Sequence, residues 1–321
     1  MHSFKKAIPA AGICLVLLVI VWALDFILYP CTFMRNDIHA VSTETFDDVF
    51  VGTSHGKMNI DPETMESVTG RSGHNLCVGG EYPEDVLYLT KLMIEKGHAP
   101  SRLVYEISPG YFVREKEEGN NYLLFYHEFP LSVSKLQYFG STLLKANFRT
   151  VFFPWYEYAL SYELQNVGKT VGKKIRRDFS EDGFSTDKQE YHSSGFIERY
   201  PVEISEDDES PDEWYPEDIT DKNMQDLEAL ISLCNENGIE FVAVTTPLSD
   251  VAFEDCKDGN DALNDFYSEF FEEKGVTYIN FNYGEYYDMT EHELSNYTDL
   301  DGHMNGDAAR EFSKVLAEVL P

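Results

Sequence analysis

The chain has 321 residues, of which 43% are hydrophobic and 14% aromatic, so it can bury a sizeable core in one large domain or two small ones. It carries 57 acidic and 25 basic residues, and its formal net charge is -32 at pH 7. This balance argues against DNA or RNA as a partner, because binding phosphates needs a basic surface. It also argues against a domain that lies flat on an anionic membrane.

The N-terminal segment has the composition of a membrane anchor. Lys5 and Lys6 precede an apolar run from Ala7 to Tyr29, and Pro30 ends the run. A membrane-spanning helix needs about 20 residues, so this run is long enough to cross a bilayer. Because the two lysines lie on its N-terminal side, we expect the N-terminus in the cytoplasm and the rest of the chain outside the cell membrane.

A cleaved leader and a lipid anchor are the alternatives for this segment. A signal peptide needs small residues directly after its apolar core, whereas residues 25–30 are bulky. A lipoprotein needs a small residue before its cysteine, but Ile13 precedes Cys14 and Pro30 precedes Cys31. We therefore expect residues 1–30 to form a single-pass anchor and residues 31–45 a tether.

From residue 46 to the C-terminus, strand-like and helix-like segments alternate. Repeated units of this kind predict an α/β domain with a parallel sheet that helices cover on both faces. The expected strands are 46–51, 74–78, 102–107, 239–246 and 276–281, and the main expected helices are 83–96, 224–237, 261–274 and 305–320. A short helix is expected to open at Pro62 with Asp61 as its cap.

Two segments interrupt this alternation. Residues from about 122 to 174 are rich in aromatic side chains, and we expect two or three inserted helices there. These helices either enclose a core of their own or present a docking face for a membrane partner or an acyl donor. Residues from about 203 to 221 include ten acidic and no basic residues, which predicts a solvated, poorly ordered loop.

Cysteine usage indicates neither a metal nor a redox centre. The five cysteines include no Cys-x-x-Cys pair and no Cys/His cluster with metal-ligand spacing, so we expect no metal and no cofactor. Cys77 lies in an apolar run and is expected to be a small buried hydrophobic residue. A disulfide between Cys234 and Cys256 is allowed in an oxidising compartment, and the sequence leaves it open.

Ser54 lies where a parallel sheet presents its reactive groups. It follows the first expected strand and precedes a helical turn, and reactive groups gather at the carboxyl ends of such strands. Gly52 allows a tight backbone just before it. A serine on this turn can expose its hydroxyl beside backbone N–H groups, as a nucleophile and its oxyanion hole require. The alternative is a serine that only caps a helix.

A histidine that could act as a base lies before the last helix. Asp299 and Asp301 lie four and two residues upstream of His303. A loop of this kind can hold the imidazole beside a serine while one aspartate fixes its tautomer. The sequence does not decide between the two aspartates. A capping loop with an incidental histidine is the alternative interpretation.

A nucleophile after the first strand, with Asp and His before the last helix, is the chain order of the SGNH (GDSL-like) hydrolases. The chain resembles this superfamily over about residues 46–320. It is most similar to the exported bacterial branch that includes the D-alanyl transfer protein DltD and polysaccharide O-acetyltransferase-like proteins. The segments that carry the resemblance are 49–55 (Val-Phe-Val-Gly-Thr-Ser-His), 75–80 (Asn-Leu-Cys-Val-Gly-Gly), 106–112 (Glu-Ile-Ser-Pro-Gly-Tyr-Phe), 245–247 (Thr-Thr-Pro) and 301–305 (Asp-Gly-His-Met-Asn).

This resemblance implies a three-layer sandwich with a five-stranded, flavodoxin-like parallel sheet. The implied site residues are Ser54 as nucleophile, His303 as base, Asp299 or Asp301 as its partner, the amides of Ser54 and of Gly79 or Gly80 as oxyanion donors, and Asn75 as a further substrate-binding candidate. His55 has no assigned role in the family pattern: it either contacts substrate or is a structural histidine at the start of a helix. Two departures stand out. The superfamily's aspartate usually lies three residues before the histidine, where this chain has Leu300, and Ser108-Pro109-Gly110 occupies the place of its Gly-x-Asn-Asp block.

The resemblance implies a serine acyltransferase or esterase that acts outside the cell on O-acyl groups of an envelope polysaccharide or teichoic acid. A membrane-bound O-acyltransferase is implied as a partner. Two alternatives stay open. The first is a carbohydrate O-acetyl esterase, in which water accepts the acyl group. The second is a non-catalytic envelope scaffold that keeps the fold, since fold alone does not fix function.

Overall fold

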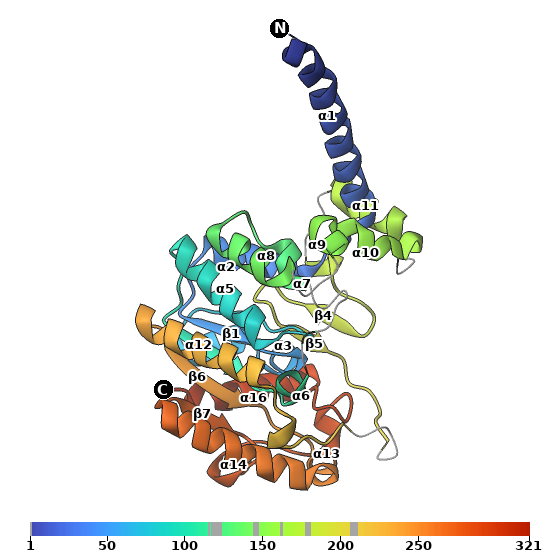
Figure 1. Ribbon diagram of the computed structural model, residues 1–321. Helices are drawn as coiled ribbons and strands as arrows, with labels where there is room; N and C mark the ends of the chain where they lie inside the picture. The colour runs from blue at the N-terminus through green and yellow to red at the C-terminus, as the bar shows by residue number, and fades with distance from the viewer. Residues whose placement is uncertain are drawn as a thin grey trace.

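A five-stranded parallel sheet forms the centre of the molecule (Figure 1). The computed structural model describes residues 2–114, 116, 124–143, 148–160, 163–176, 181–205 and 211–321. The strands are β1 (Asp48–Val51), β2 (Gly73–Asn75), β3 (Arg102–Glu106), β6 (Glu240–Thr245) and β7 (Thr277–Asn280). Their order β2-β1-β3-β6-β7 is that of flavodoxin-like sheets, so the predicted fold class is confirmed.

Helices cover both faces of the sheet because successive strand residues point to opposite sides. In β3, Leu103 and Tyr105 join one hydrophobic cluster, whereas Val104 joins the other. The first cluster includes residues of α2 (Phe33–Thr43), α5 (Pro83–Lys96), α12 (Asp221–Asn237) and α14 (Lys257–Lys274). The second lies under α4 (Pro62–Thr69) and α16 (Gly306–Val319), beside the short α3 (Ser54–Asn59). The molecule is therefore a three-layer sandwich.

The signals for helix ends act as expected from the sequence. The Asp61 carboxylate accepts a hydrogen bond from the Glu63 N–H, and Pro62 occupies the first turn of α4. Thr220 caps α12 in the same way, through the N–H of Asn223. At the other end of α12, Gly238 adopts a φ of 69°, which glycine reaches without strain.

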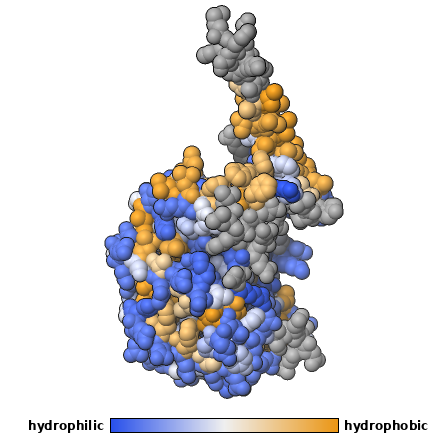
Figure 2. Space-filling view, in the orientation of Figure 1, coloured by the Kyte–Doolittle hydropathy of each residue, from blue (hydrophilic) through white to orange (hydrophobic). Residues whose placement is uncertain are grey.

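The N-terminal helix α1 (His2–Leu28) extends away from the sandwich (Figures 1 and 2). Its window Ala11–Leu28 has a mean hydropathy of 2.7 and is not buried, so it is long and apolar enough to cross a membrane. The predicted tether differs from the structure. Residues 33–43 form α2, and its Met34, Ile38 and Val41 are buried in the main core.

The aromatic insertion contains more helices than predicted. They are α7 (Leu124–Glu128), α8 (Val133–Leu143), α9 (Phe148–Phe152), α10 (Pro154–Leu160) and α11 (Val167–Arg176), with the 3-10 turn η1 (Glu163–Asn166) between the last two. Phe125, Phe129 and Tyr138 pack into the core beside α5. The described part of the insertion thus extends the main core and does not enclose a separate one.

Several smaller elements were not predicted. A hairpin of β4 (Gln189–Tyr191) and β5 (Ile197–Arg199) forms a second sheet. The remaining turns are α6 (Gly110–Val113), η2 (Glu181–Gly183), η3 (Pro216–Asp218), α13 (Asp250–Asp255), α15 (Gly284–Tyr287) and η4 (Leu294–Asn296). Cys234 and Cys256 are both free and buried, so the disulfide that the sequence allowed is not formed. Cys77 is fully buried, as predicted.

Candidate active site

Ser54 begins helix α3 directly after strand β1. Gly52, with a φ of 136°, makes the sharp turn between them. A Cβ atom at this position would lie 2.6 Å from the carbonyl oxygen of Glu106, so only glycine fits. This turn places Ser54 at the carboxyl end of the central strands, where the sequence predicted it.

The structure brings Ser54 and His303 together across 249 residues of chain. The Ser54 hydroxyl oxygen lies 2.8 Å from His303 Nε2, and His303 Nδ1 lies 2.8 Å from an Asp299 carboxylate oxygen. The three side chains form the hydrogen-bonded chain of a serine, a base and an orienting acid. Asp301 is exposed and lines the neighbouring cavity, so Asp299 is the aspartate that contacts the imidazole.

The loop before α16 holds Asp299 four residues upstream of His303 instead of the usual three. The second carboxylate oxygen of Asp299 accepts the His303 backbone N–H at 3.1 Å, and the Thr298 N–H donates to the His303 carbonyl at 2.7 Å. Gly302 makes the turn possible with a φ of 105°. Leu300, at the usual aspartate position, is buried in this arrangement.

Arg199 also contacts Asp299, and no sequence pattern pointed to this residue. Arg199 lies at the end of β5. Its guanidinium donates, at 2.7 Å, to the Asp299 oxygen that also contacts His303 Nδ1. Burial alone would raise the pKa of Asp299, but its hydrogen bond with His303 and the charges of His303 and Arg199 lower that pKa to about 2. Asp299 is therefore ionised at neutral pH and orients the imidazole as an acceptor.

His303 has the protonation state that a base requires. Burial lowers its pKa, the hydrogen bond to Asp299 opposes this change, and the charge of His55 lowers the pKa further. The imidazole is consequently neutral at pH 7 and can accept the Ser54 proton at Nε2. Its side chain is only 12% exposed, so few water molecules compete for that nitrogen.

His55 lies beside this pair and is paired with a buried carboxylate. Its Nδ1 is 3.7 Å from a Glu106 oxygen, and its ring centroid is 4.9 Å from that of His303. Burial disfavours the charged imidazole, but the nearby carboxylate of Glu106, with smaller effects of Asp299 and Asp301, raises the pKa of His55. The two neighbouring histidines are thus shifted in opposite directions, the pattern of an acid and a base in one site.

Glu106 is a second residue that the sequence analysis missed. It ends β3, close to the place where the superfamily pattern expects its Gly-x-Asn-Asp block. One carboxylate oxygen accepts the Thr53 N–H at 2.8 Å and the Thr53 hydroxyl at 2.7 Å. The available signal was an acidic residue directly after the run Leu103–Tyr105. Glu106 braces the turn that carries Ser54 and holds His55 at the same time.

The expected oxyanion donors separate into two groups. Gly79 lies against Ser54, since a Cβ atom on it would be 3.5 Å from the serine Cβ. Gly80 instead donates its N–H to the Tyr111 hydroxyl at 3.0 Å. Asn75 is fully buried and does not line the cavity; its amide donates to the carbonyls of Gly56 and Ile60. This leaves the amides of Ser54 and Gly79 as candidate donors, while Asn75 supports α3.

A cavity of about 310 Å³ opens beside Ser54. It follows the carboxyl ends of β3, β6 and β7, and its walls combine aromatic rings with amide side chains, among them Tyr267, Tyr278, Asn264 and Asn280. Trp214 lines it from the segment that the sequence predicted as a solvated loop, with its ring 4.9 Å from the Arg114 guanidinium. Residues 206–210 of that segment lie outside the described residues.

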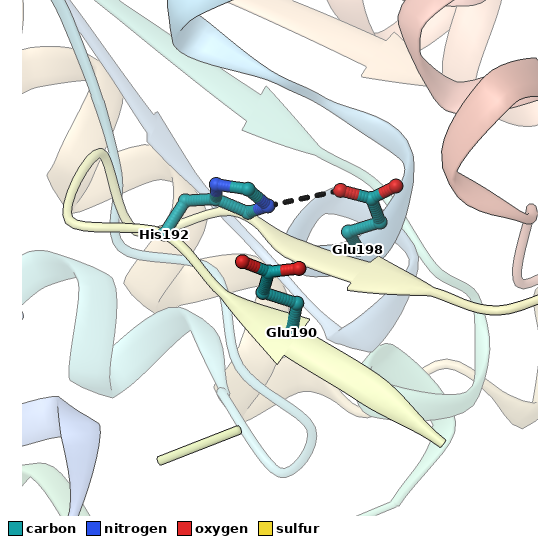
Figure 3. Close-up of side chains that lie close together, drawn as sticks. All are labelled: Glu190, His192 and Glu198. Atoms are coloured by element: carbon teal, nitrogen blue, oxygen red, sulfur yellow. Dashed lines mark hydrogen bonds and ion pairs between the residues drawn. The ribbon is translucent and has the colours of Figure 1, made fainter. Parts of the chain in front are cut away.

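A second polar cluster lies on the hairpin and could be taken for a metal site. Glu190, His192 and Glu198 converge there, with His192 Nε2 3.0 Å from Glu198 (Figure 3). Glu198, however, also accepts two hydrogen bonds from the guanidinium of Arg310 in α16. A resident cation in direct contact repels a metal ion. We therefore assign this cluster to the attachment of β5 to α16.

Comparisons with known proteins add little to this geometry. No protein-family model matches the chain, and no curated protein matches it in sequence. One solved structure that aligns with it is a protein from Desulfitobacterium hafniense DCB-2 that is assigned to the lipolytic G-D-S-L family. That alignment has 9% sequence identity and a TM-score of 0.39, and covers 85% of this chain and 99% of the other. Such a likeness is too low to show a shared activity.

Proposed function

We propose that this protein is a membrane-anchored serine acyl-transfer enzyme that acts outside the cell membrane on O-acyl groups of an envelope polysaccharide or teichoic acid. The hydrogen-bonded chain of Ser54, His303 and Asp299 at the mouth of a cavity carries this proposal. The three side chains have the geometry and the protonation states that nucleophilic acyl chemistry needs.

In the first step, Ser54 Oγ attacks the carbonyl carbon of an ester and passes its proton to His303 Nε2. Asp299 stabilises the imidazolium that forms. The carbonyl oxygen becomes an oxyanion, and we assign its stabilisation to the amides of Ser54 and Gly79, which lies beside Ser54. The intermediate collapses, the alcohol leaves with the proton from His303, and the acyl group stays on Ser54.

In the second step, an acceptor hydroxyl attacks the acyl-enzyme and gives its proton to His303. The bond between the acyl carbon and Ser54 Oγ then breaks, and the serine takes that proton back from His303 Nε2. A sugar or polymer hydroxyl makes the protein an O-acyltransferase, and water makes it an esterase. Tethering by α1 favours transfer, because it raises the local concentration of any donor that the membrane delivers. A membrane-bound O-acyltransferase is the partner that this arrangement would suit.

We assign to His55 the role of contacting the substrate. Glu106 favours its protonated form, and both residues line the cavity. A cationic imidazole there can donate a hydrogen bond to a substrate oxygen, a contribution that the two backbone amides alone do not make.

The test is covalent labelling of the full-length protein in detergent. We expect a fluorophosphonate, or an activated acetyl ester, to leave one adduct on the peptide that contains Ser54, seen by mass spectrometry. Ser54→Ala should abolish the adduct and all ester turnover. Ser108→Ala is the matched control, since Ser108 lines the same cavity and should keep both. An unlabelled wild-type protein, or a labelled Ser54→Ala variant, would refute the nucleophile.

The aspartates supply a second comparison within one loop. Asp299→Asn should lower turnover on the order of 10⁴-fold, because the imidazole loses the carboxylate that fixes its tautomer. Asp301→Asn should retain most activity, since Asp301 is exposed and Asp299 holds His303 Nδ1. The opposite ranking would reassign the orienting acid. Adding a glycan or teichoic acid acceptor to the labelled enzyme then separates transfer from hydrolysis by the product that forms.

A further inference from the structure

The membrane-side end of the domain is fastened to the end of the anchor helix. Lys174, in α11, donates to the carbonyls of Asp25, Phe26 and Tyr29 at 2.9, 3.0 and 2.5 Å. Asp25 and Phe26 lie in the last turn of α1, and Tyr29 directly follows the helix. Carbonyls at this end of a helix need partners from outside it, although the Asp25 carbonyl also accepts the Tyr29 backbone N–H. The backbone N–H of Trp155, in α10, also donates to the Asp25 carboxylate at 3.2 Å. The inserted helices therefore have a fixed position relative to α1.

Exposed apolar side chains gather on these same helices. Twelve large hydrophobic residues outside α1 are exposed among the described residues, and seven of them lie between residues 131 and 175. We call this set the collar: Leu131, Val133, Leu136, Phe148, Phe152, Leu164 and Ile175. Leu131 is 86% exposed and Ile175 is 69% exposed, so neither side chain packs into a core.

The spacing within each helix places the collar on outward faces. Val133 and Leu136 are three residues apart in α8, and Phe148 and Phe152 are four apart in α9, so each pair shares one side of its helix. The inner side of α8 carries Tyr138, which is fully buried. α8 is thus apolar on both sides, a pattern that a helix on a water-exposed surface does not need.

The charge of this region is opposite to that of the whole chain. Residues 122–177 contain eight basic and three acidic residues, whereas the full chain carries a net charge of -32. Lys169, Lys173 and Arg176 accompany Ile175 on α11. A positive, apolar region next to an apolar helix suits the headgroup region of a bilayer, although the rest of the domain is repelled by anionic lipid.

We propose that the collar is a lipid-binding surface that lies in the headgroup and upper acyl region of the outer leaflet around α1. Figure 1 shows α9, α10 and α11 around the base of α1, and Figure 2 shows hydrophobic surface continuing from α1 onto the domain. The window Ala11–Leu28 has 18 residues, and at about 1.5 Å per residue it matches a hydrocarbon core of about 30 Å. Lys174 donates a hydrogen bond to the Phe26 carbonyl near the end of this window. The collar therefore lies at the level of the bilayer surface.

The occupant is the bilayer itself, and the proposal depends on α1 spanning it but not on the catalytic assignment. A second copy of the chain or an integral membrane protein would need a matching apolar face. The bilayer already surrounds α1 and is continuous with the collar. If both α1 and the collar contact the membrane, the orientation of the Ser54 cavity relative to the membrane is fixed as well.

Photocrosslinking of the full-length protein tests this surface. The photoreactive residue p-benzoylphenylalanine replaces Leu136 or Phe152 in protein reconstituted into vesicles of phosphatidylcholine and phosphatidylglycerol. Trp22→p-benzoylphenylalanine, in α1, is the positive control, and Val68→p-benzoylphenylalanine is the matched control. Val68 is 44% exposed on α4, on the opposite face of the sheet from α8.

We expect phospholipid adducts by mass spectrometry at positions 136 and 152, at a yield at least tenfold above that at position 68. Both collar side chains face outward, so the substitutions should leave the circular dichroism spectrum unchanged. A lipid adduct at position 22 without one at either collar position would overturn the proposal. Crosslinks between two copies of the chain in place of lipid adducts would overturn it as well.

Discussion

At the scale of single residues, the site depends on two histidines with opposite charge preferences around one serine. His303 contacts Ser54 and has a lowered pKa, whereas His55 contacts Glu106 and has a raised pKa. Their rings lie 4.9 Å apart, so protonation of either disfavours protonation of the other. In this arrangement the protonated form is favoured at His55 and disfavoured at His303, which can therefore act as the base.

Replacing His55 by glutamine tests this coupling. Loss of a neighbouring positive charge makes the protonated form of His303 easier to reach, so the pKa of His303 should rise. Activity requires neutral His303 and is lost as the pH falls through that pKa. The acidic limb of a plot of kcat/KM against pH, measured with a neutral ester, should therefore move to higher pH in His55→Gln. The plateau should fall about 10²-fold if His55 also donates to the oxyanion.

His98→Gln is the control for this experiment. His98 lies in the loop between α5 and β3, where its ring forms a hydrogen bond with the Thr45 hydroxyl. It does not line the cavity. Its replacement should change neither the limb nor the plateau. An acidic limb that stays in place in His55→Gln would mean that the two histidines titrate independently, and the assignment of His55 as the charged partner would fail.

At the scale of secondary-structure elements, strongly periodic segments were predictable and short ones were not. All five strands of the main sheet and its long helices α5, α12, α14 and α16 match their predicted positions to within a few residues. Their signals were long apolar runs ended by glycine or proline, which act locally. The same logic placed Ser54 and His303 at one edge of the sheet.

The missing parts of the site come from elements that are too short to recognise. Arg199 lies in a hairpin whose strands have three residues each, a length at which no alternation can be detected. The choice of Asp299 depends on a hydrogen bond to the His303 backbone, which spacing alone does not reveal. Helix α2 was missed because its buried face includes Asp37, an acidic residue that a sequence pattern assigns to the surface.

Asp37 belongs to a buried network that fixes the helix behind Ser54. Lys57 in α3 is 1% exposed, and its ammonium donates to the Asp37 carboxylate at 2.8 Å and to the Asn75 carbonyl at 2.9 Å. The Tyr191 hydroxyl donates to the other Asp37 oxygen at 2.6 Å. The ion pair thus joins α2 to α3, the helix that begins at Ser54, and the Tyr191 hydrogen bond adds β4.

We expect Lys57→Met to lower the free energy of unfolding by about 3–5 kcal/mol, because Asp37 would remain buried without its cation. Chemical denaturation of the full-length protein in detergent measures this change. The double variant Lys57→Met with Asp37→Asn removes both charges and should recover much of the loss. A double variant as unstable as Lys57→Met would show that side-chain packing, and not the unpaired carboxylate, sets the cost.

At the scale of the whole molecule, charge is distributed unevenly. The full chain has a net charge of -32, whereas residues 122–177 near the anchor contain eight basic and three acidic residues and are positive. A net negative charge of this size repels anionic molecules from the domain. Asp212 and Asp301 line the cavity and add negative charge there, beside the single guanidinium of Arg114. An anionic substrate is therefore repelled as it approaches Ser54, whereas a neutral substrate is not.

This field predicts how salt changes the activity. Raising the ionic strength from about 0.01 M to about 0.15 M shortens the screening length from about 30 Å to about 8 Å and weakens the repulsion of an anionic ester. We expect kcat/KM for an acetylated, negatively charged substrate to rise on the order of tenfold over this range. For a neutral acetyl ester of the same leaving group, kcat/KM should stay constant, which controls for salt effects on His303. A salt dependence that is equal for both esters would mean that the charge of the domain does not act on substrate entry.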